Sequence, residues 1–280
     1  GIPAVTNFRR GDVALGGQGA PLVPIGDFLL FSEQADAFLN IGGFVNISFK
    51  KGDEITAFDI CPGNLPLNKF AETLGLKYDK NGEIAKNGQL DESLLKELNN
   101  INYYSLAAPK SLGTEWLEKQ FLPLIPKELS PEKKIRTITE HIAIQISAVL
   151  NDQQLNSVFI TGGGAHNNFL IECLKQYFSG NVIIPKEEII DFKEAIVFAF
   201  LGARYLRNES TTISSVTGGA SLLTVAYTLG ASNGGSAVTS VEYSLDSGAW
   251  VAFSGTISPQ TITGLTAGST YSVRIRSVNA

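Results

Sequence analysis

The sequence predicts an α/β fold followed by a small all-β unit. Two observations carry this prediction: strand-like and helix-like segments alternate through residues 1–208, and residues 209–280 have a different composition. Residues 1–208 hold 44 of the charged side chains, whereas residues 209–280 hold five, together with 25 serines and threonines and nine glycines. Short β-branched and aromatic runs between turn-like clusters are typical of an all-β unit. We therefore expect two domains, 1–208 and 209–280, joined by a short connection.

Three strand-like segments come first, at residues 37–41, 44–49 and 55–60. Turn residues separate them, Gly42-Gly43 in the first gap and Lys51-Gly52-Asp53 in the second. Short connections of this kind join antiparallel neighbours, so we expect a three-stranded meander.

A long amphipathic helix follows Ser130-Pro131, a typical N-cap with proline at the first helical position. Isoleucine and valine then recur at spacings of three and four up to Val149. Beyond it, the pattern predicts a buried strand at 157–161, a tight loop at Gly162–Gly164 and a helix at 167–179. A last helix is expected at 191–207.

Composition excludes several classes of function. The net charge is −5 with no basic run, which disfavours nucleic acid as a partner. Cys61 and Cys173 stand in no Cys/His cluster, so no zinc site is expected, and no apolar run is long enough to span a membrane. The GxSxG and HExxH motifs are absent, so the sequence does not support a hydrolase or zinc-protease function. Of the two histidines, His141 on the isoleucine-rich helix is a weak candidate, and His166 is slightly stronger because it lies in the glycine loop.

Two glycine turns are candidate ligand sites. Gly162-Gly163-Gly164, with Asn167 after it, lies between a strand and a helix, where bare backbone can approach a nucleotide. The alternative is a tight turn that only needs positive φ. The second candidate is the segment from Asn40 to Gly42-Gly43, and the alternative there is an ordinary hairpin turn.

Two carboxylates are candidate reactive groups. Asp59 ends a predicted strand, where α/β folds place their sites, and either acts as a general base or caps the helix that starts near Leu65. Glu194 enters an apolar helix and either faces a cleft or is a solvated first-turn residue favoured by the helix dipole.

The first 208 residues resemble the family of 1,6-anhydro-N-acetylmuramic acid kinases. The matching blocks occur in the family's order: Asn7–Asp12 with Val13–Pro24, Leu39–Ile47, Phe58–Asn64, Tyr78–Gly82, Ala108–Gly113, Phe159–Asn167 and Glu194–Phe200. The resemblance implies a partial actin, Hsp70 and sugar-kinase fold, built from ribonuclease-H-like lobes. It further implies that ATP phosphorylates the sugar O6 while water opens the anhydro bridge, giving N-acetylmuramic acid 6-phosphate in cell-wall recycling.

Site roles follow from the same resemblance. Asp59 is the expected base that activates water, and Mg²⁺ is expected with ATP. Asn40, Gly42 and Gly43 are expected on the phosphate side of the nucleotide, and Gly162, Gly163, Gly164 and Asn167 on its adenosine side. Arg9, Arg10 and Glu194 are the expected sugar-facing residues. The partners implied are a small amino sugar and a second copy in a homodimer, with no nucleic acid and no membrane.

The chain departs from the family pattern in two places. Asp59-Ile60-Cys61-Pro62 stands where the family usually has Asp-Thr-Gly-Pro. The family's Gly-Thr-Ser-x-Asp-Gly phosphate loop precedes the first matching block and is absent from this sequence. Loss of that clamp predicts weak ATP binding and the loss of positioning worth about 7 to 11 kcal/mol in favourable cases.

Residues 209–280 resemble a truncated bacterial fibronectin type III repeat. Leu265 and Tyr271 are the expected core positions, and Tyr271, Val273, Ile275 and Ser277 alternate onto one strand face. The sequence ends before a last strand, which predicts an open sheet edge. The alternative to an enzyme is thus a non-enzymatic interaction or structural protein, as a fragment or an engineered fusion. ATP use favours the cytoplasm.

Overall fold

The structure is a computed structural model that describes residues 5–14, 18–52, 54–207, 209–217, 221–229, 236–265 and 271–279. Two compact units divide the chain: Val23–Glu209 forms one, and Gly1–Leu22 with Ser210–Ala280 forms the other. The predicted turn residue Asp53, the tail turn at 232–235 and residues 266–270 lie outside the described residues.

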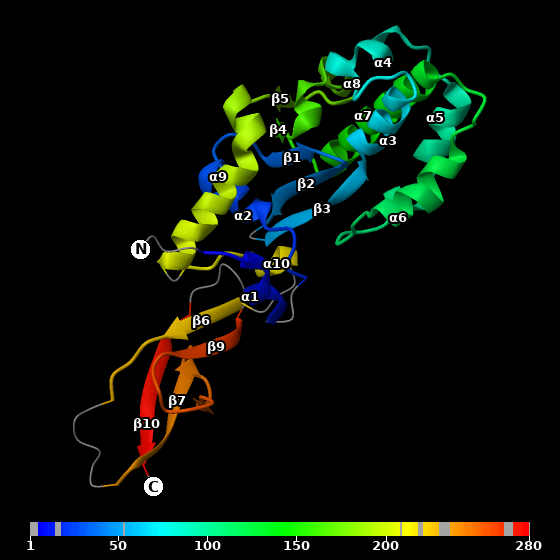
Figure 1. Ribbon diagram of the computed structural model, residues 1–280. Coiled ribbons are helices and arrows are strands. Elements are labelled where there is room, and N and C mark those ends of the chain that lie inside the picture. The colour runs from blue at the N-terminus through cyan, green and yellow to red at the C-terminus, as the bar shows by residue number, and fades with distance from the viewer. Residues whose placement is uncertain are drawn as a thin grey trace. The chain divides into compact units, whose positions relative to one another are not determined.

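The larger unit is an α/β unit in which helices cover both faces of one sheet (Figure 1). Its strands are β1 (Ala37–Ile41), β2 (Phe44–Lys51), β3 (Glu54–Pro62), β4 (Ser157–Thr161) and β5 (Asn181–Ile183). Its helices are α2 (Val23–Leu30), α3 (Asn64–Glu72), α4 (Glu83–Asn87), α5 (Glu92–Asn99), α6 (Thr114–Trp116), α7 (Pro131–Asp152), α8 (Asn168–Tyr177) and α9 (Glu187–Leu206). Short 3-10 turns occur at Lys80–Gly82, Asn102–Ser105, Leu122–Leu124 and Gly163–His166, and a π-helix at Leu117–Phe121.

The sheet has the order β3-β2-β1-β4-β5. β1, β2 and β3 form the predicted antiparallel meander, and β4 and β5 run parallel to β1. The predicted strands at 37–41 and 157–161 are confirmed to the residue, and the predicted second and third strands lie within β2 and β3.

The hydrophobic core lies between the sheet and α7, on the face that we call the α7 face. Ile135, Ile138, Ile142 and Ile146 are fully buried there, as the isoleucine spacing predicts, and Ser130 caps the helix by accepting from the Lys133 amide. Residues of the sheet that point to this side, including Leu39 and Ile47, belong to the same cluster.

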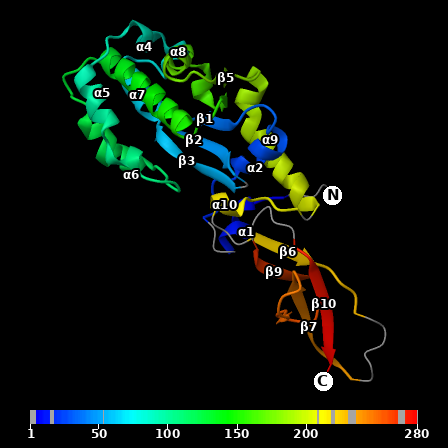
Figure 2. The same ribbon diagram turned by 180° about the vertical axis from the view of Figure 1, so that it is seen from behind.

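The opposite face of the sheet carries α2 and α9 and is here called the α9 face (Figure 2). Phe28 of α2 packs edge-on against Phe38 of β1, with ring centroids 5.3 Å apart, and Phe159 of β4 completes this smaller cluster. Each strand therefore alternates between two apolar layers, which fixes its register.

Two helix starts differ from the sequence prediction. α8 begins at Asn168 with Asn167 as its cap, one residue later than predicted. α9 begins at Glu187 rather than residue 191, because Glu187 and Glu188 occupy the first turn, where the helix dipole favours acidic side chains. Glu194 is consequently not a first-turn residue.

The smaller unit contains a two-stranded sheet, β6 (Ser221–Val225) with β9 (Gln260–Leu265), and a three-stranded sheet with the order β10-β7-β8. The latter consists of β7 (Val238–Leu245), β8 (Val251–Ala252) and β10 (Val273–Asn279). Both sheets are antiparallel, and Val241, Phe253 and Ile262 form the buried centre between them. Val273 and Ile275 pack against that centre, as their alternation predicts, and Leu265 packs there as well.

Helices α1 (Phe8–Ala14) and α10 (Ser214–Thr217) also belong to this unit. The carboxylate of Asp12 joins them, since it accepts from the amide of Gly19 and the hydroxyl of Thr217, which is fully buried. Residues 1–22 therefore group with the tail, although their sequence resemblance is to the kinase-like part. Among the described residues, no helix has the length and apolar character that a bilayer crossing requires.

Candidate active site

Four polar residues stand side by side across the sheet at the carboxyl ends of β1 and β4. The strand register pairs Thr161 with Asn40, Asn40 with Asn46, and Asn46 with Asp59. Directly paired residues project to the same side of a sheet, so all four belong to the α9 face. We refer to Thr161, Asn40, Asn46 and Asp59 as the polar row.

A β-bulge in β3 places Asp59 in the polar row. Asn46 pairs with Asp59, whereas its neighbour Val45 pairs with Cys61, so Ile60 is an extra residue in β3. Ile60 and Cys61 are both buried in the core on the α7 face. The side chains that replace the family's Thr-Gly are thus core residues here.

The Asp59 carboxylate is half-buried and held by backbone. Its Oδ2 accepts from the amide of Leu112 at 2.8 Å, in the family-like block 108–113. Burial raises the pKa of the Asp59 carboxyl above its usual value, and the Leu112 hydrogen bond opposes this by lowering it. The capping alternative fails, because Gly63 is the N-cap of α3 and no side chain caps that helix.

The two predicted glycine turns lie against each other. A Cβ on Gly162 would be 2.4 Å from Oδ1 of Asn40, and a Cβ on Gly164 would be 2.1 Å from Cγ2 of Ile41. Gly162 also has φ of +81°, a conformation that side chains disfavour. Glycine is therefore required for this contact, which brings the Gly162–Gly164 turn onto the end of β1.

The hairpin turn at Gly42-Gly43 is tied to the start of α3. The amide of Asn64 donates to Gly42 O and that of Gly63 to Gly43 O, both at 2.8 Å. The Asn64 side chain donates to Ile41 O at 3.2 Å. These bonds satisfy amide groups that a helix start leaves without intrahelical partners.

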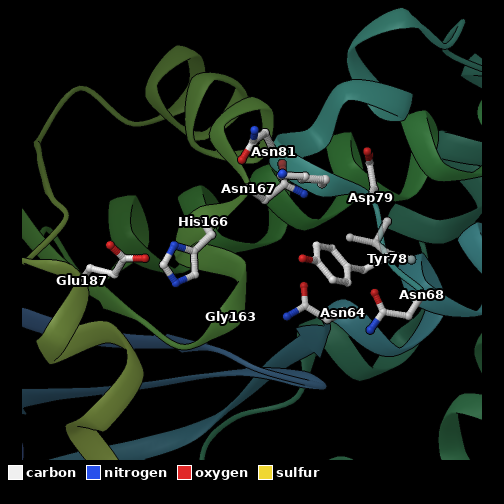
Figure 3. A pocket seen from close by; sticks show the side chains of 11 residues that line it. Asn64, Asn68, Tyr78, Asp79, Asn81, Gly163, His166, Asn167 and Glu187 are labelled. Atoms are coloured by element: carbon white, nitrogen blue, oxygen red, sulfur yellow. The ribbon is translucent and has the colours of Figure 1, made fainter. Parts of the chain in front are cut away.

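A pocket of about 520 Å³ opens beside these turns (Figure 3). In the view of Figure 3, the Tyr78 ring lies between Asn64 and Asn68 on one side and Asn81 and Asn167 on the other, with His166 farther away. The full lining is Asn64, Leu67, Asn68, Tyr78, Asp79, Lys80, Asn81, Gly163, His166, Asn167 and Glu187. Amides and one aromatic ring dominate it, as expected for a small polar ligand with a planar group.

Not all lining side chains are available to a ligand. Both carboxylate oxygens of Asp79 accept from the amides of Ile84 and Ala85, at 2.8 and 3.0 Å. Oδ1 of Asn167 accepts from the Leu170 amide at 3.0 Å, as the cap of α8. These two residues shape the pocket wall through their structural bonds.

The structure brings part of the predicted site together. Asn40, Gly42, Gly43 and the turn Gly162–Gly164 meet at the carboxyl end of β1, and Gly163 and Asn167 line the pocket. Asp59 lies two strands away on β3, in the same polar row as Asn40. Glu194 is exposed on α9, eight residues into the helix. Arg9 and Arg10 lie on α1 in the smaller unit, where Arg9 Nη1 donates to Gly19 O at 2.6 Å.

Sequence reasoning missed most of the pocket. Tyr78–Gly82 was recognisable as a family-like block, but nothing in the block itself assigned it a role. A signal was present: Asn81 and Gly82 both adopt positive φ, and Asn-Gly is a typical turn pair. His141, in contrast, is fully buried and structural.

The polar row, the glycine turns and the adjoining pocket define an α/β protein whose polar cleft suits a small ligand. The family model described as "Anhydro-N-acetylmuramic acid kinase" matches residues 1–232, so this chain belongs to that family. The match runs past residue 208, where the composition changes.

Relatives with the same description support this assignment. The chain is 37% identical to the protein of Francisella tularensis subsp. novicida over 234 residues, and 36% identical to that of Clostridioides difficile over 232 residues. The alignments cover 78% and 76% of this chain but 61% of each relative, so the chain spans less than two thirds of their length.

One solved structure, the activator of 2-hydroxyisocaproyl-CoA dehydratase from Clostridium difficile with bound ADPNP, is similar at a TM-score of 0.43 and 15% identity over 67% of each chain. That likeness is too distant to bear on fold or ligand.

Proposed function

We propose that this chain takes part in the ATP-dependent phosphorylation of 1,6-anhydro-N-acetylmuramic acid at O6, with hydrolytic opening of the anhydro bridge to N-acetylmuramic acid 6-phosphate. Membership of the kinase family supports the reaction class. The single observation that carries the residue assignment is the polar row, which links the Asp59 carboxylate to Asn40 and so to the Gly162 turn.

Asp59 serves as the general base in this proposal. Water attacks the anomeric carbon, its proton passes to the Asp59 carboxylate, and the bond from that carbon to O6 breaks. O6 then bonds to the γ-phosphorus of ATP, and ADP leaves. The pKa of Asp59, raised by burial, makes the carboxylate a stronger proton acceptor than a fully solvated one.

The nucleotide is assigned to the pocket and to the glycine turns. Gly163, Asn167 and the Tyr78 ring, which line the pocket, are assigned to the adenosine. Asn40, Gly42 and Gly43 are assigned to the phosphate side. The close contact between Gly162 and Asn40 supports this order, because it makes the two turns one continuous surface.

Mg²⁺ is implied by the same chemistry, since it neutralises charge on the phosphoryl oxygens. Across the ranges that the structure describes, no three His, Cys, Asp or Glu side chains gather as a metal-binding group. The described side chains therefore do not form a cage for the ion.

Arg9, Arg10 and Glu194 are proposed to face the sugar, and a second copy of the chain is the proposed protein partner. The larger unit is proposed as one ribonuclease-H-like lobe of the sugar-kinase fold. Its order β3-β2-β1-β4-β5, with β2 alone antiparallel to its neighbours, supports this. Because the reaction consumes ATP, we place it in the cytoplasm.

Residues 209–280 are proposed to be a fibronectin type III-like unit, separate from a kinase-like part at 1–208. Two facing antiparallel sheets, β6 with β9 and β8 with β7 and β10, support this. If these residues bind a protein or glycan saturably while the chain never turns over ATP, the interaction role replaces the enzymatic one.

The decisive experiment titrates the chain with Mg-ATP, with and without the anhydro sugar, and follows ADP formation. We expect a dissociation constant below about 1 mM and turnover that needs both substrates. Asp59→Asn should keep nucleotide binding and lose turnover. Glu172→Gln, which removes an exposed carboxylate paired with Lys86, is the matched control and should behave like the parent chain. Turnover that survives Asp59→Asn would exclude Asp59 as the base.

A further inference from the structure

One loop holds Asp59 at three separate atoms. The hydroxyl of Tyr103 donates to Asp59 O at 2.7 Å, and the amide of Asp59 donates to Lys110 O at 3.1 Å. The amide of Leu112 donates to the Asp59 carboxylate at 2.8 Å. We refer to residues 103–112 as the Asp59 loop. It also covers β3, which is an edge strand of the sheet.

The side chain of Lys110 closes the Asp59 loop on itself. Its Nζ donates to the carbonyl oxygens of Tyr103 at 3.2 Å and Tyr104 at 3.3 Å. The same Nζ lies 4.8 Å from the centroid of the Tyr103 ring and 5.5 Å from that of Phe58. A single ammonium group thus joins the end of the loop to its beginning.

The beginning of the loop is anchored independently of Lys110. Tyr104 Oη lies 2.9 Å from Nε2 of His141 on α7, and the Tyr103 ring packs against Trp116 at 5.3 Å. Residues 105–109 between the two ends are exposed. Two ties therefore hold the end of the loop near Asp59: the backbone bond from the Asp59 amide to Lys110 O, and the closure that the Lys110 side chain provides.

We propose that Lys110 is a positioning residue that keeps the Leu112 amide on Oδ2 of Asp59 and thereby assigns proton transfer to Oδ1. The inference rests on the proposed role of Asp59 as the base. This proposal gives a function to residues 108–113. The resemblance to the family assigned no role to any residue of that block.

The groups around Asp59 determine how its pKa changes when the loop opens. The titratable groups near Asp59 are Cys61 on β3, and Tyr103 and Lys110 on the Asp59 loop. Burial, and to a smaller extent the Asp59 carboxylate, raise the pKa of the Cys61 thiol and of the Tyr103 hydroxyl, so both are neutral at neutral pH. The Leu112 amide lowers the pKa of Asp59, and removing it leaves the raising effect of burial unopposed.

Lys110→Met tests the closure, because methionine keeps an unbranched chain and removes the donors. Aspartate-specific ¹³C labelling, with Asp59→Asn to assign the signal, gives the pKa of Asp59 in each variant. We expect that pKa to rise by about one pH unit in Lys110→Met, the size of a hydrogen bond to a charged group. Hydrogen exchange at the Leu112 amide should accelerate about tenfold.

Two variants serve as controls. Lys110→Arg keeps a cation long enough to reach both carbonyls and should restore the parent pKa. Lys134→Met removes a comparable lysine, which donates to Lys127 O and lies over the Phe70 ring, and should leave Asp59 unchanged. If Lys110→Met does not fold, Lys110→Gln retains one shorter donor and should give a smaller rise of the same sign.

The readouts separate this inference from the proposed function. An unchanged Asp59 pKa and unchanged Leu112 exchange in Lys110→Met, or an equal effect in Lys134→Met, would overturn the positioning role whatever the activity. Loss of turnover in Asp59→Asn decides the role of Asp59 alone. Where turnover is measurable, the acid limb of its pH profile should shift upward in Lys110→Met together with the pKa of Asp59, whereas KM for ATP stays constant.

Discussion

Gly162 and Asn40 approach so closely that a Cβ atom on Gly162 would lie 2.4 Å from the Asn40 side-chain oxygen. Asn40 lies near the end of β1 and Gly162 in the turn after β4, and the parallel pairing of the two strands brings them together. Their contact places the backbone of the Gly162 turn directly against the polar row.

Gly162→Ala should therefore destabilise the chain by about 2 to 4 kcal/mol, from steric conflict added to backbone strain. Chemical unfolding measures this loss. Gly75→Ala is the matched control, since Gly75 also has positive φ, at +76°, but nothing lies within 4 Å of its Cβ position. Its expected cost is about 1 kcal/mol, and equal losses for the two variants would contradict the steric argument.

Lys193 and Asp27 form a buried ion pair on the α9 face, with Nζ 2.6 Å from Oδ1 and each side chain 5% exposed. Lys193→Met should cost about 3 to 5 kcal/mol of unfolding free energy, because among the described residues the Asp27 carboxylate then keeps the Ser48 hydroxyl but no cation as a partner. Replacing both charged residues by apolar ones should cost less than the single change. Lys86→Met, in an exposed pair with Glu172, should cost under about 1 kcal/mol.

His141 should make the chain less stable in acid. Burial lowers its pKa from 6.5 to about 3, and the neutral ring suits its partners: Nδ1 donates to Asn99 Oδ1 at 2.6 Å and Nε2 accepts from Tyr104. Between these pKa values the unfolded chain binds the proton and the folded chain does not. Stability from this group is complete above about pH 6.5 and is lost as the pH falls toward 3.

Unfolding free energies at pH 6.5 and pH 4 should differ by on the order of 3 kcal/mol more in the parent chain than in His141→Gln. His166→Gln is the control, because that ring is exposed beside Asp191. A parent chain and His141→Gln with the same pH dependence would show that the ring is protonated in the folded state.

Tyr78→Ala should weaken Mg-ATP binding by about tenfold, since the ring lies among the amide side chains of the pocket. Tyr78 is 52% exposed, so the change should leave the thermal unfolding midpoint nearly unaltered. Tyr205→Ala removes a comparably exposed ring from α9, outside the pocket lining, and should bind as the parent does. Equal affinities in all three chains would place the nucleotide elsewhere.

The sheet and α7 could be predicted because their signals are local. Gly42-Gly43 predicts the turn of the first hairpin, and the isoleucine spacing from Ile135 onward predicts a helix with one buried side. Asp59 was predicted to end its strand, whereas β3 continues past it to Pro62 through the bulge at Ile60. The start of α9 was predicted wrongly, because Glu187 and Glu188 extend the helix beyond its apolar run.

The pocket and the Asp59 loop could not be derived from periodicity. Asn64, Tyr78 and Gly163 come from three separate segments of the chain, and their meeting depends on strand order and helix packing. Leu112 reaches Asp59 through a backbone amide, which leaves no residue-type signal in the sequence. The family-like blocks indicated which segments matter and not which atoms they bring together.

The bulge at Ile60 gives the two sides of Asp59 different packing restraints. Ile60 and Cys61 are consecutive and both lie within the core, so the peptide after Asp59 cannot turn unless two side chains leave their packed positions. Residues 105–109 on the other side are exposed and carry no such restraint. The core thus restrains the Asp59 backbone directly, whereas the exposed part of the loop is held only through the hydrogen bonds at its two ends.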